Sequence, residues 1–498
     1  MSSLKDYRDQ IDTIDNEMAE LFQKRMELVE KVAEYKALNN IATNVSSREE
    51  EVINSHIDSL DEKWRDSYKE FMQNMFTVSK NYQDRFNKRN EPLLKYSTDY
   101  TTFVDNAFIA SQNAKKDLLT NPDTVNATIG SLFGEDGKIW SFETVYHYYD
   151  MVPDKRKASY ASLIQGNDDY NEAVFNWLNR LDNINLPHRS IATPGGTGAL
   201  SMTLANTMEK NETLLLPKIG WGSYKLMAYQ FGLKTAFYDM FKDDRLSIED
   251  IKKQATEIMD RQHKVVIVIN DPCHNPTGTS MGNELWSQLV DFFNELSEKG
   301  SVIIINDIAY LDYAYDYEHA TEYMGNFNRL NENVAVVIAF SCSKSLTAYG
   351  MRLGDAIILN KNEEKVTRMF NGFVRYARSC WSNANNGFMD AFVLVTNDKE
   401  NYIKEKDVAV NALKKRSEIF MSQARECGLP LYPYNEGFFI TLKIDNSIID
   451  KYYQKLNENH IYPVKFNNGI RVAICGLSIK QCDGLAYRMK EILDQVNQ

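Results

Sequence analysis

The sequence predicts a helical N-terminal module followed by a larger α/β region, in which a mostly parallel sheet has helices on both faces and a smaller α/β domain is attached. Residues 4–36 show helical spacing of apolar side chains without Gly or Pro. The runs 265–270, 301–305 and 334–340 are continuous, apolar and rich in β-branched residues, as in buried parallel strands. Because 498 residues exceed the usual size of one compact core, we expect several domains.

The N-terminal module is expected to contain three helices, with the second beginning after Ser47 and the third over about residues 63–86. Three cations stand out on the first helix. Arg25 and Lys36 are eleven residues apart, close to three turns, so they share a face. Arg8 is rotated from Arg25 by roughly a quarter turn at about 100° per residue. One helix therefore cannot direct all three at one small ligand, but two antiparallel helices in a dimer can.

Further polar groups are expected on the other two helices, where Ser79 and Gln83 lie one turn apart. A solvated helix face is the simpler explanation for each residue alone. The combined pattern nevertheless resembles the all-helical chorismate mutases over roughly residues 3–88. The matching positions are Arg8, Arg25, Lys36, Arg48, Glu49, Ser79 and Gln83.

This resemblance implies the rearrangement of chorismate to prephenate without a covalent step, through conformational restraint and electrostatic help at the breaking ether bond. It assigns the three arginines to the carboxylates and hydroxyl region of the substrate, and Lys36 and Gln83 to the ether oxygen. It also implies a homodimer, because in that family the first-helix arginine comes from the partner subunit. Val45 stands where the family often has Asp, which predicts weaker substrate binding.

The most informative part of the α/β region follows the apolar run 334–340. Ser341, Ser343 and Lys344 come at its end, and Arg352 lies eight residues after the lysine. A lysine on rigid backbone, with hydroxyls and a cation nearby, suits an amine that forms a Schiff base beside a phosphate. A solvated surface lysine is the usual alternative for such a string taken alone.

Polar residues also follow two other predicted strands. Asp307 and Tyr310 come after the run 301–305, and Asn275 lies in an Asn-Pro-Thr-Gly turn after the run 265–270. A pyridoxal ring needs a carboxylate at its nitrogen and donors to its phenolic oxygen, and these side chains fit both tasks. For Asp307, capping of the following turn is the alternative.

Two further segments suit a bound phosphate and a flat ring. A glycine-rich turn precedes a helical run at Gly196 and Thr197, so their backbone N–H groups can approach an anion at a helix N-terminus. Trp221 offers a ring that can stack on a pyridine, although a core tryptophan is the usual alternative.

In their order, these segments resemble the fold-type I, class I aminotransferases of the aspartate and aromatic kind, over roughly residues 99–498. The resemblance implies pyridoxal 5'-phosphate as the cofactor, with Lys344 as the Schiff-base lysine and proton shuttle. Tyr160 is implied to reach the phosphate from a second subunit. Gly195 stands where the family usually has Ser, which removes one phosphate hydroxyl. The implied cofactor-binding residues are Gly196, Thr197, Trp221, Asn275, Asp307, Tyr310, Ser341, Ser343, Lys344, Arg352 and Tyr160.

Three residues are implied to contact the substrate. Arg471 matches the arginine that holds the α-carboxylate, since a guanidinium forks onto two oxygens, and Gly130 matches the glycine beside that carboxylate. Arg378 has the spacing of an arginine that binds the distal carboxylate across the dimer in dicarboxylate-specific members. A helix-surface arginine is an equally good interpretation of Arg378.

The composition is that of an ordinary globular protein, with 43% hydrophobic and 25% charged residues. A net charge of −12 without a basic stripe argues against nucleic acid as a partner. Six scattered cysteines and seven histidines predict neither disulfides nor a metal site, and packing explains Cys273 and His274. No signal peptide and no apolar run of membrane length is visible, so we expect a cytoplasmic protein without membrane association.

We expect a mutase-like domain over 1–90 and an aminotransferase-like region over 95–498. The latter should divide into a large cofactor domain of about 143–398 and a small domain of 95–142 plus 399–498. The preferred function is a bifunctional enzyme of aromatic amino-acid biosynthesis acting on chorismate, amino acids and 2-oxo acids. One alternative makes the helical module a sensor of an aromatic metabolite. Another is a different pyridoxal enzyme, such as a decarboxylase or lyase.

Overall fold

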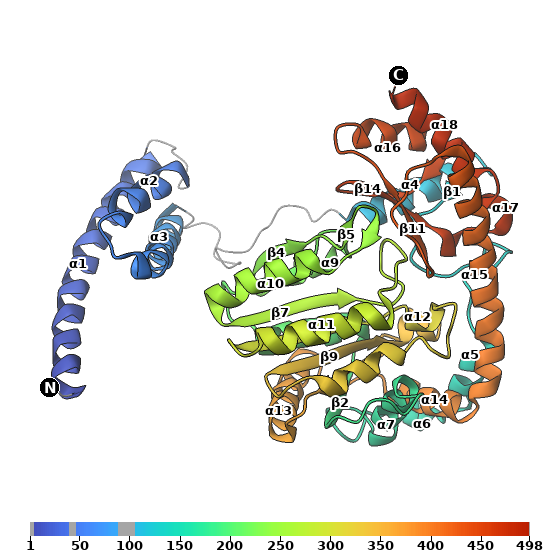
Figure 1. Ribbon diagram of the computed structural model, residues 1–498, viewed down its shortest axis with the longest axis horizontal. Coiled ribbons are helices and arrows are strands. Elements are labelled where there is room, and N and C mark those ends of the chain that lie inside the picture. Colours follow the sequence, from blue (N-terminus) through green and yellow to red (C-terminus); the bar gives the residue numbers. More distant parts are fainter. Residues whose placement is uncertain (1–3, 39–45, 88–104, 498) are drawn as a thin grey trace. The chain divides into compact units, whose positions relative to one another are not determined.

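The computed structural model describes residues 4–38, 46–87 and 105–497. The chain divides into two compact units, Met1–Val104 and Asp105–Gln498 (Figure 1). The predicted boundary between residues 90 and 95 lies outside the described residues, as does Val45. The predicted fold class is confirmed, with an all-helical first unit and a second unit built on a mixed sheet.

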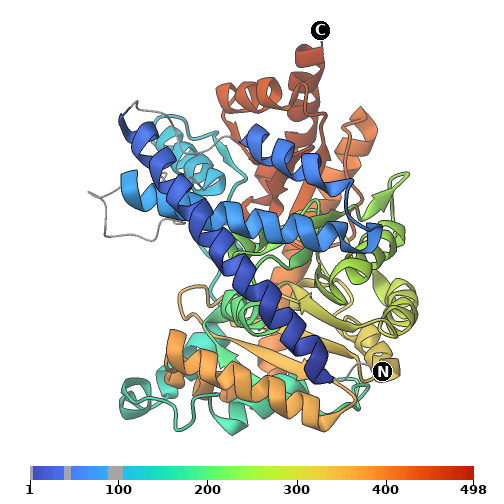
Figure 2. The same ribbon diagram turned by 90° about the vertical axis from the view of Figure 1, so that its left-hand side faces the viewer.

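In its described residues, 4–38 and 46–87, the first unit contains three α-helices and one short 3₁₀ helix. The first helix forms one long continuous rod (Figure 2). The first and second helices both pack on the third. Their bounds are α1 (Leu4–Leu38), α2 (Ser46–Ile57), η1 (Glu62–Trp64) and α3 (Arg65–Asn87).

Only a small part of the apolar face of α1 is buried within this unit. Val29 and Ala33 are buried, and Ile53 of α2 and Met72 of α3 are buried as well. The predicted helical spacing is therefore correct, but the described residues of this unit leave most of the apolar face exposed. The large apolar side chains of α1 that stay exposed are Leu4, Tyr7, Ile11, Ile14, Met18, Leu21, Phe22, Leu28, Val32 and Tyr35.

The second unit is built on a seven-stranded sheet of order β2-β10-β9-β8-β7-β3-β4. Every neighbouring pair is parallel except those made by β10, which is antiparallel to β2 and β9. Asn270 pairs with Asp307, and Asp307 with Ala339, so the carboxyl ends of three strands lie side by side. The strands are β2 (His188–Thr193), β3 (Thr213–Pro217), β4 (Lys234–Tyr238), β7 (Lys264–Asn270), β8 (Ser301–Asp307), β9 (Val334–Ser341) and β10 (Gly354–Leu359).

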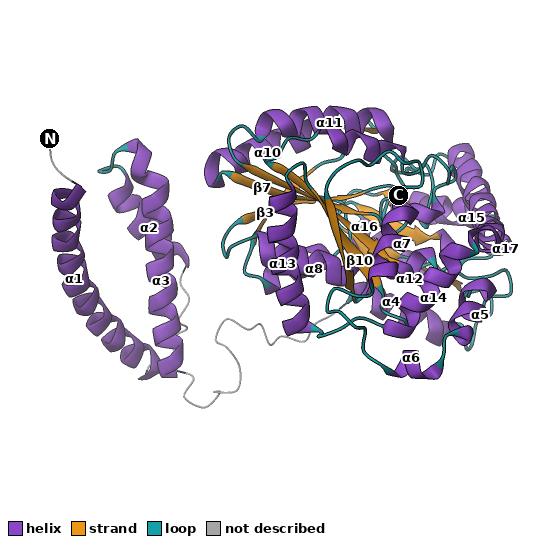
Figure 3. Ribbon diagram, turned by 90° about the horizontal axis from the view of Figure 1, so that it is seen from below, coloured by secondary structure: helices purple, strands orange, loops and turns teal. Residues whose placement is uncertain are grey.

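Helices cover both faces of this sheet (Figure 3). α10 (Glu249–Gln262) and α11 (Gly282–Leu296) lie on one face, and α8 (Gly195–Thr207) and α13 (Glu363–Cys380) lie on the other. Alternate residues of a strand therefore enter different cores: in β7, the odd-numbered side chains join one apolar cluster and the even-numbered ones the other. This two-sided burial is why the strands read as continuous apolar runs.

The remaining helices and short strands either lie around the seven-stranded sheet or form a second, smaller layer. They are α5 (Glu143–Met151), α6 (Asp154–Ala158), α7 (Asp168–Leu178), α9 (Ser223–Gln230), β5 (Phe241–Lys242), β6 (Arg245–Leu246), η2 (Leu311–Tyr313), η3 (Glu322–Arg329), α12 (Cys342–Ser345) and α14 (Asn386–Asn397). Those of the smaller layer are α4 (Asn106–Asp117), β1 (Val125–Asn126), α15 (Lys399–Cys427), β11 (Phe439–Lys443), α16 (Ile449–Glu458), β12 (Ile461–Tyr462), β13 (Val464–Phe466), β14 (Gly469–Ala473), η4 (Ile474–Gly476), α17 (Ile479–Cys482) and α18 (Leu485–Asn497).

In the smaller layer, β11, β14 and β13 form an antiparallel sheet, and β1 pairs with β12. The backbone N–H of Ala473 donates to the carbonyl of Ala127 at 2.9 Å, which brings the segment before Gly130 beside the strand of Arg471. The residue limits of a large and a small domain remain a prediction. Within the described ranges, no helix is long and apolar enough to cross a membrane.

Candidate active sites

Lys344 lies one turn beyond the end of β9, on the short helix α12. Its Nζ donates to the carbonyl of Gly130 at 2.5 Å and lies 4.8 Å from the centroid of the Tyr349 ring. Burial is the largest of the effects that lower the pKa of Lys344 to about 8, and the nearby cations Arg471 and Arg352 contribute to the same shift. The lysine therefore has an accessible neutral form close to physiological pH.

Asp307 ends β8 and is 4% exposed. Its Oδ2 accepts a hydrogen bond from the Tyr224 hydroxyl at 2.5 Å, and its Oδ1 accepts one from the backbone N–H of Ala309 at 3.1 Å. Burial raises the pKa of Asp307, and these two donors oppose that shift. The sequence analysis missed Tyr224. Its position three residues after Trp221, on the first turn of α9, was the available signal.

Asn275 and Tyr310 meet as the sequence predicted. The side-chain amide of Asn275 donates to the Tyr310 hydroxyl at 3.3 Å, and both residues are more than 90% buried. The backbone N–H of Asn275 donates to Oδ1 of Asn270 at 2.7 Å, which holds the turn against the end of β7. Two polar groups thus converge beside Asp307 at the carboxyl edge of the sheet.

A hydroxyl and guanidinium cluster lies at the start of α8 and α12. Arg352 donates to the Ser343 hydroxyl at 3.1 Å, and the Ser341 hydroxyl accepts from the backbone N–H of Ser343 at 3.4 Å. Gly195 has φ +74, and a Cβ added there would lie 2.8 Å from Nη2 of Arg352. The Ser that the aminotransferase family usually has at position 195 would therefore be strained by the positive φ and would displace the Arg352 guanidinium.

Arg471 faces the same region from β14. Its Nη2 donates to the Thr128 carbonyl at 2.9 Å and its Nη1 to Oδ1 of Asn275 at 3.3 Å, while Nε is buried without a partner among the described residues. Burial lowers the pKa of Arg471. A Cβ added to Gly130 would meet Phe439 at 3.5 Å and Nζ of Lys344 at 3.8 Å. The Arg471 guanidinium and the Lys344 amine thus hold the same short segment, at Thr128 and Gly130, and lie close enough for the Arg471 charge to act on Lys344.

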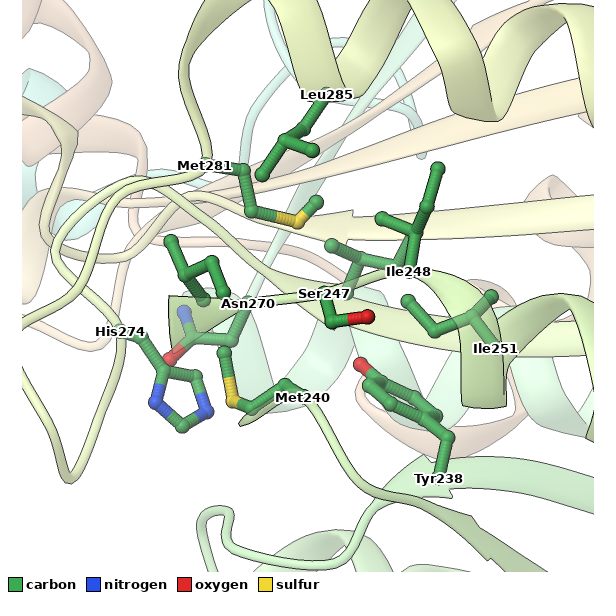
Figure 4. A pocket seen from close by; sticks show the side chains of 11 residues that line it. Tyr238, Met240, Ser247, Ile248, Ile251, Asn270, His274, Met281 and Leu285 are labelled. Atoms are coloured by element: carbon green, nitrogen blue, oxygen red, sulfur yellow. The ribbon is translucent and has the colours of Figure 1, made fainter. Parts of the chain in front are cut away.

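A pocket lies behind the Asn-Pro-Thr-Gly turn (Figure 4). Its cavity of about 10 Å³ holds no more than one water molecule, so it does not accommodate an organic ligand. His274 borders it, is 1% exposed, and has Nδ1 2.8 Å from the Thr277 hydroxyl. Burial lowers the pKa of His274 to about 3, so the ring stays neutral. Its contacts support a packing role.

Two predicted residues lie away from this cluster. Tyr160 is 82% exposed, and Arg378 is exposed near the C-terminal end of α13, where its Nη1 donates to the Ser382 hydroxyl at 2.6 Å. In the described part of one chain, neither contacts the other predicted cofactor residues. Trp221 is half-buried and packs edge-on against Tyr224, and Thr197 is exposed on the first turn of α8.

In the first unit, three of the predicted polar residues come together. Arg25 donates to the Ser79 hydroxyl, and its guanidinium lies 5.9 Å from the centroid of the Phe76 ring. Gln83 follows one turn later on α3 and is 8% exposed, with a buried Oε1 that has no hydrogen-bond partner in the described ranges. Burial lowers the pKa of Arg25.

The predicted charges of α2 take partners of their own. Glu49 pairs with Lys80 at 2.5 Å, and Arg48 pairs with Glu51 at 2.7 Å on the exposed side. The sequence analysis did not single out Lys80, although it adjoins Ser79. Lys36 is half-buried near the end of α1. Arg8 is exposed and lies about 26 Å from Arg25 along the same helix, at about 1.5 Å per residue.

The residues of the second unit fit pyridoxal phosphate. The buried carboxylate of Asp307 suits a protonated ring nitrogen, and Asn275 and Tyr310 suit the phenolic oxygen. The cluster of Ser341, Ser343 and Arg352, beside Gly195, where an added Cβ would crowd Arg352, suits a phosphate.

Two families match this chain. Residues 153–489 match the model of the family described as aminotransferase class I and II, and residues 7–84 match that of chorismate mutase type II. The resemblance to both families is thereby confirmed.

Individual relatives of the second unit are also aminotransferases. The aspartate aminotransferase of Salmonella typhi is 26% identical over 246 residues, which are 48% of this chain and 60% of that protein. The aromatic-amino-acid aminotransferase of Pseudomonas aeruginosa is 26% identical over 212 residues, 42% of this chain and 51% of that protein. The chain thus spans about half to three fifths of the length of these curated relatives.

Solved structures are similar over a longer part of the chain. An aminotransferase from Anaerococcus prevotii has a TM-score of 0.78 and 28% identity, covering 82% of this chain and 100% of that one. An aromatic-amino-acid aminotransferase from Burkholderia pseudomallei, covalently bound to pyridoxal phosphate, has a TM-score of 0.66 and 19% identity, covering 80% of this chain and 100% of that one. At that identity, the second likeness shows the fold alone.

Proposed function

The chain belongs to the class I and II aminotransferase family and carries a chorismate mutase type II region at its N-terminus, and on this premise we propose that it is a bifunctional enzyme of aromatic amino-acid biosynthesis. One region rearranges chorismate to prephenate. The other transfers an amino group between an amino acid and a 2-oxo acid. The observation that carries the second activity is the convergence of Lys344 and Arg471 on the backbone segment of Thr128 and Gly130.

Pyridoxal 5'-phosphate is the proposed cofactor, and when bound it supplies an aldehyde and an electron-withdrawing ring. Lys344 is the residue that moves a proton at the substrate α-carbon. Its pKa of about 8 supports this role, because a base acts best near the working pH. Asp307 keeps a ring nitrogen protonated, and Tyr224 holds that carboxylate in place.

The phosphate is held by the hydroxyls of Ser341 and Ser343, by Arg352, and by backbone N–H groups at the start of α8. Trp221 packs on the ring. Tyr160 reaches the phosphate of a second subunit, a proposal supported by its 82% exposure in one chain.

Arg471 binds the substrate α-carboxylate. Support comes from its unpartnered Nε and from its guanidinium, which makes hydrogen bonds only to neutral oxygens in the described residues. Because the Arg471 guanidinium is already positioned and has no carboxylate partner there, it can bind the carboxylate of a substrate. Arg378, from the partner subunit, binds a second carboxylate, which makes prephenate and dicarboxylic amino acids candidate substrates.

In the mutase region, Arg25, Arg48 and the partner's Arg8 hold the carboxylates and hydroxyl of chorismate, while Lys36 and Gln83 act at the ether oxygen. Gln83 is 8% exposed and lies one turn after Ser79, which accepts from Arg25, and its side-chain amide nitrogen is the group that can donate to the ether oxygen. Glu49 is the remaining polar residue that we place in this site. The reaction needs only restraint and charge complementarity.

A homodimer is part of the proposal. The exposed stripe of α1 includes Ile11 and Ile14, each 55% exposed, and such a continuous apolar face is typical of an interaction surface. A second copy with α1 antiparallel covers the stripe and delivers Arg8 to the site that Arg25 begins.

A substrate panel tests the proposal. The purified chain is assayed for loss of chorismate, and then for stoichiometric exchange between amino acids and prephenate, phenylpyruvate or oxaloacetate. We expect both activities. Absence of chorismate turnover would favour the alternative in which the helical region only binds an aromatic metabolite. Release of carbon dioxide or ammonia without a paired amino acid and oxo acid would favour a decarboxylase or lyase.

A further inference from the structure

A groove of about 360 Å³ lies on the second unit between α7, the start of β2 and the middle of α13. Volumes of about 300–1,000 Å³ are typical of small-molecule sites. The groove takes His188 and Ser190 from the beginning of β2, whereas the other end of that strand, Thr193, leads into the turn at Gly195. Those ends are about 17 Å apart at about 3.3 Å per residue, so the groove is separate from the proposed cofactor site.

The two walls of the groove carry opposite charges. Asp168 and Glu172 lie one helical turn apart on α7, so their carboxylates share a face. Arg189 lies opposite them on β2. Its side chain is 48% exposed, and its nearest carboxylate, Glu363, is 3.6 Å away. This guanidinium can therefore take an additional anionic partner.

Aromatic rings lie between the charged walls. Phe175 stacks on His188 with ring centroids 3.5 Å apart and an angle of 9° between the planes. Phe370 contributes a second half-buried ring from α13. Burial lowers the pKa of His188, so the stacked pair is uncharged at neutral pH. The groove thus offers flat apolar surface between an anionic and a cationic wall.

Two buried oxygens that line the groove have no hydrogen-bond partner among the described residues. Asn171 uses its amide nitrogen on the Gln165 carbonyl at 3.2 Å, which leaves its Oδ1 without a donor. Ser190 is 8% exposed, and its hydroxyl makes no hydrogen bond within 3.5 Å to any described residue, although it lies close enough to the buried Asp355 carboxyl to oppose the rise of that group's pKa. Buried polar atoms of this kind are costly unless a ligand or an ordered water completes them.

We propose that this groove binds a free α-amino acid with an aromatic side chain. The ammonium group pairs with Asp168 and Glu172 and donates to Oδ1 of Asn171. The carboxylate pairs with Arg189 and accepts from the Ser190 hydroxyl. The side-chain ring packs on Phe370 and on the Phe175–His188 stack. The assignment rests on the groove and not on either proposed activity.

The test is calorimetric titration of the full chain with L-phenylalanine. The titrated protein carries Arg471→Leu, so that the active site cannot hold the same amino acid by its carboxylate, and circular dichroism verifies that it is folded. We expect saturable binding of one molecule per chain. Adding Arg189→Leu, or Glu172→Gln, should weaken it at least tenfold, whereas the exposed controls Arg425→Leu and Glu418→Gln should not change it.

Three analogues separate the recognition elements: 3-phenylpropionate lacks the ammonium group, phenethylamine lacks the carboxylate, and L-alanine lacks the ring. Each should bind at least tenfold more weakly than L-phenylalanine. Absence of binding, or equal binding by the groove variants and the controls, overturns the proposal.

If Arg471→Leu does not fold, the unsubstituted chain should bind one molecule of L-phenylalanine more than the Arg189→Leu chain does, whether or not the active site also binds it. A single site in both would also overturn the proposal. Separate transamination assays of the unsubstituted chain report on the proposed function, so either can fail without the other.

Discussion

Arg416 on α15 donates from Nη2 to Oε1 of Glu135 at 2.6 Å, and its guanidinium is fully buried. The same side chain donates to the carbonyls of Phe133, at 2.8 Å, and Cys475, at 3.3 Å. It therefore ties the segment that follows Gly130 to the segment that follows β14. These two segments carry the glycine and the arginine that border the proposed substrate space.

This pair predicts an unequal response to substitution. Glu135→Ala leaves a buried guanidinium without its carboxylate. Because Glu135 itself is 46% exposed, the free energy of unfolding should fall by about 1–3 kcal/mol, the cost of leaving a buried donor unsatisfied. Arg416→Met in addition should recover part of that loss, because it removes the unpaired charge. Urea unfolding of the single and double variants measures the difference. Additive losses would show that the pair is not coupled.

Lys344→Ala should remove transamination and the visible absorbance of bound pyridoxal phosphate. Chorismate turnover should survive, because that rearrangement needs no cofactor. Lys299→Ala, at an exposed lysine that pairs with Asp260, is the matched control and should change neither. Visible absorbance spectra and assays of transamination and chorismate turnover test these expectations for both variants. Normal transamination by Lys344→Ala would remove the central assignment of this residue.

Tyr224→Phe tests the hydrogen bond to Asp307. Loss of the donor should raise the pKa of Asp307 further, since burial already raises it and Tyr224 opposes that shift. Transamination should fall by about tenfold or more, as expected for a hydrogen bond to a charged group worth about 1.5–3 kcal/mol. The absorbance of the bound cofactor should change with pH over a range that differs from that of the unsubstituted chain. Tyr229→Phe on the same helix, 52% exposed, should behave as the unsubstituted chain.

Arg378→Leu tests the second substrate carboxylate. If this arginine reaches the partner's site, the variant should lose use of prephenate and aspartate far more than use of phenylpyruvate. The expected selective loss is about 2–5 kcal/mol in transition-state stabilisation, the range for truncating a buried charge pair. Arg375→Leu, also exposed on α13, controls for the loss of a helix charge. An equal loss of activity on every substrate would indicate that Arg378 is a helix-surface residue that does not bind substrate.

Arg25→Ala should reduce chorismate turnover by roughly 100-fold or more, because it removes a preorganised charge partner. Arg8→Ala alone should also be impaired. In mixed dimers of the two variants, one site can regain both arginines if each site uses α1 helices from two chains. Turnover should therefore rise after mixing, in proportion to the heterodimer measured by mass spectrometry. No recovery in verified heterodimers would argue for a site formed by one chain.

Much of the fold could be predicted because its signals are local. The first helix was expected over residues 4–36 and spans Leu4–Leu38, since apolar periodicity without Gly or Pro defines a helix over such a length. The three apolar runs became β7, β8 and β9 because strands buried on both faces need continuous apolar sequence. Asp307, Asn275 and Lys344 follow those strands, so their meeting at one edge followed from the parallel arrangement.

Other features depend on contacts between residues far apart in the sequence. Tyr224 and Asp307 are 83 positions apart in the sequence. Hydrophobic periodicity therefore cannot predict the hydrogen bond between them. The sequence analysis treated Gly195 as the loss of a phosphate hydroxyl, whereas the structure shows that its positive φ and the nearby Arg352 guanidinium disfavour a side chain there.

By itself, the sequence determined two modules of different fold class and the set of residues at the strand ends, because hydrophobic periodicity and turn chemistry act within a few residues. Only the tertiary structure decided which side chains complete one another: Tyr224 with Asp307, Arg416 with Glu135, and Arg25 with Ser79. The physical reason is that hydrogen bonds and ion pairs require positions correct to a few tenths of an ångström. Strand register and helix packing set such positions, and both are properties of the whole fold.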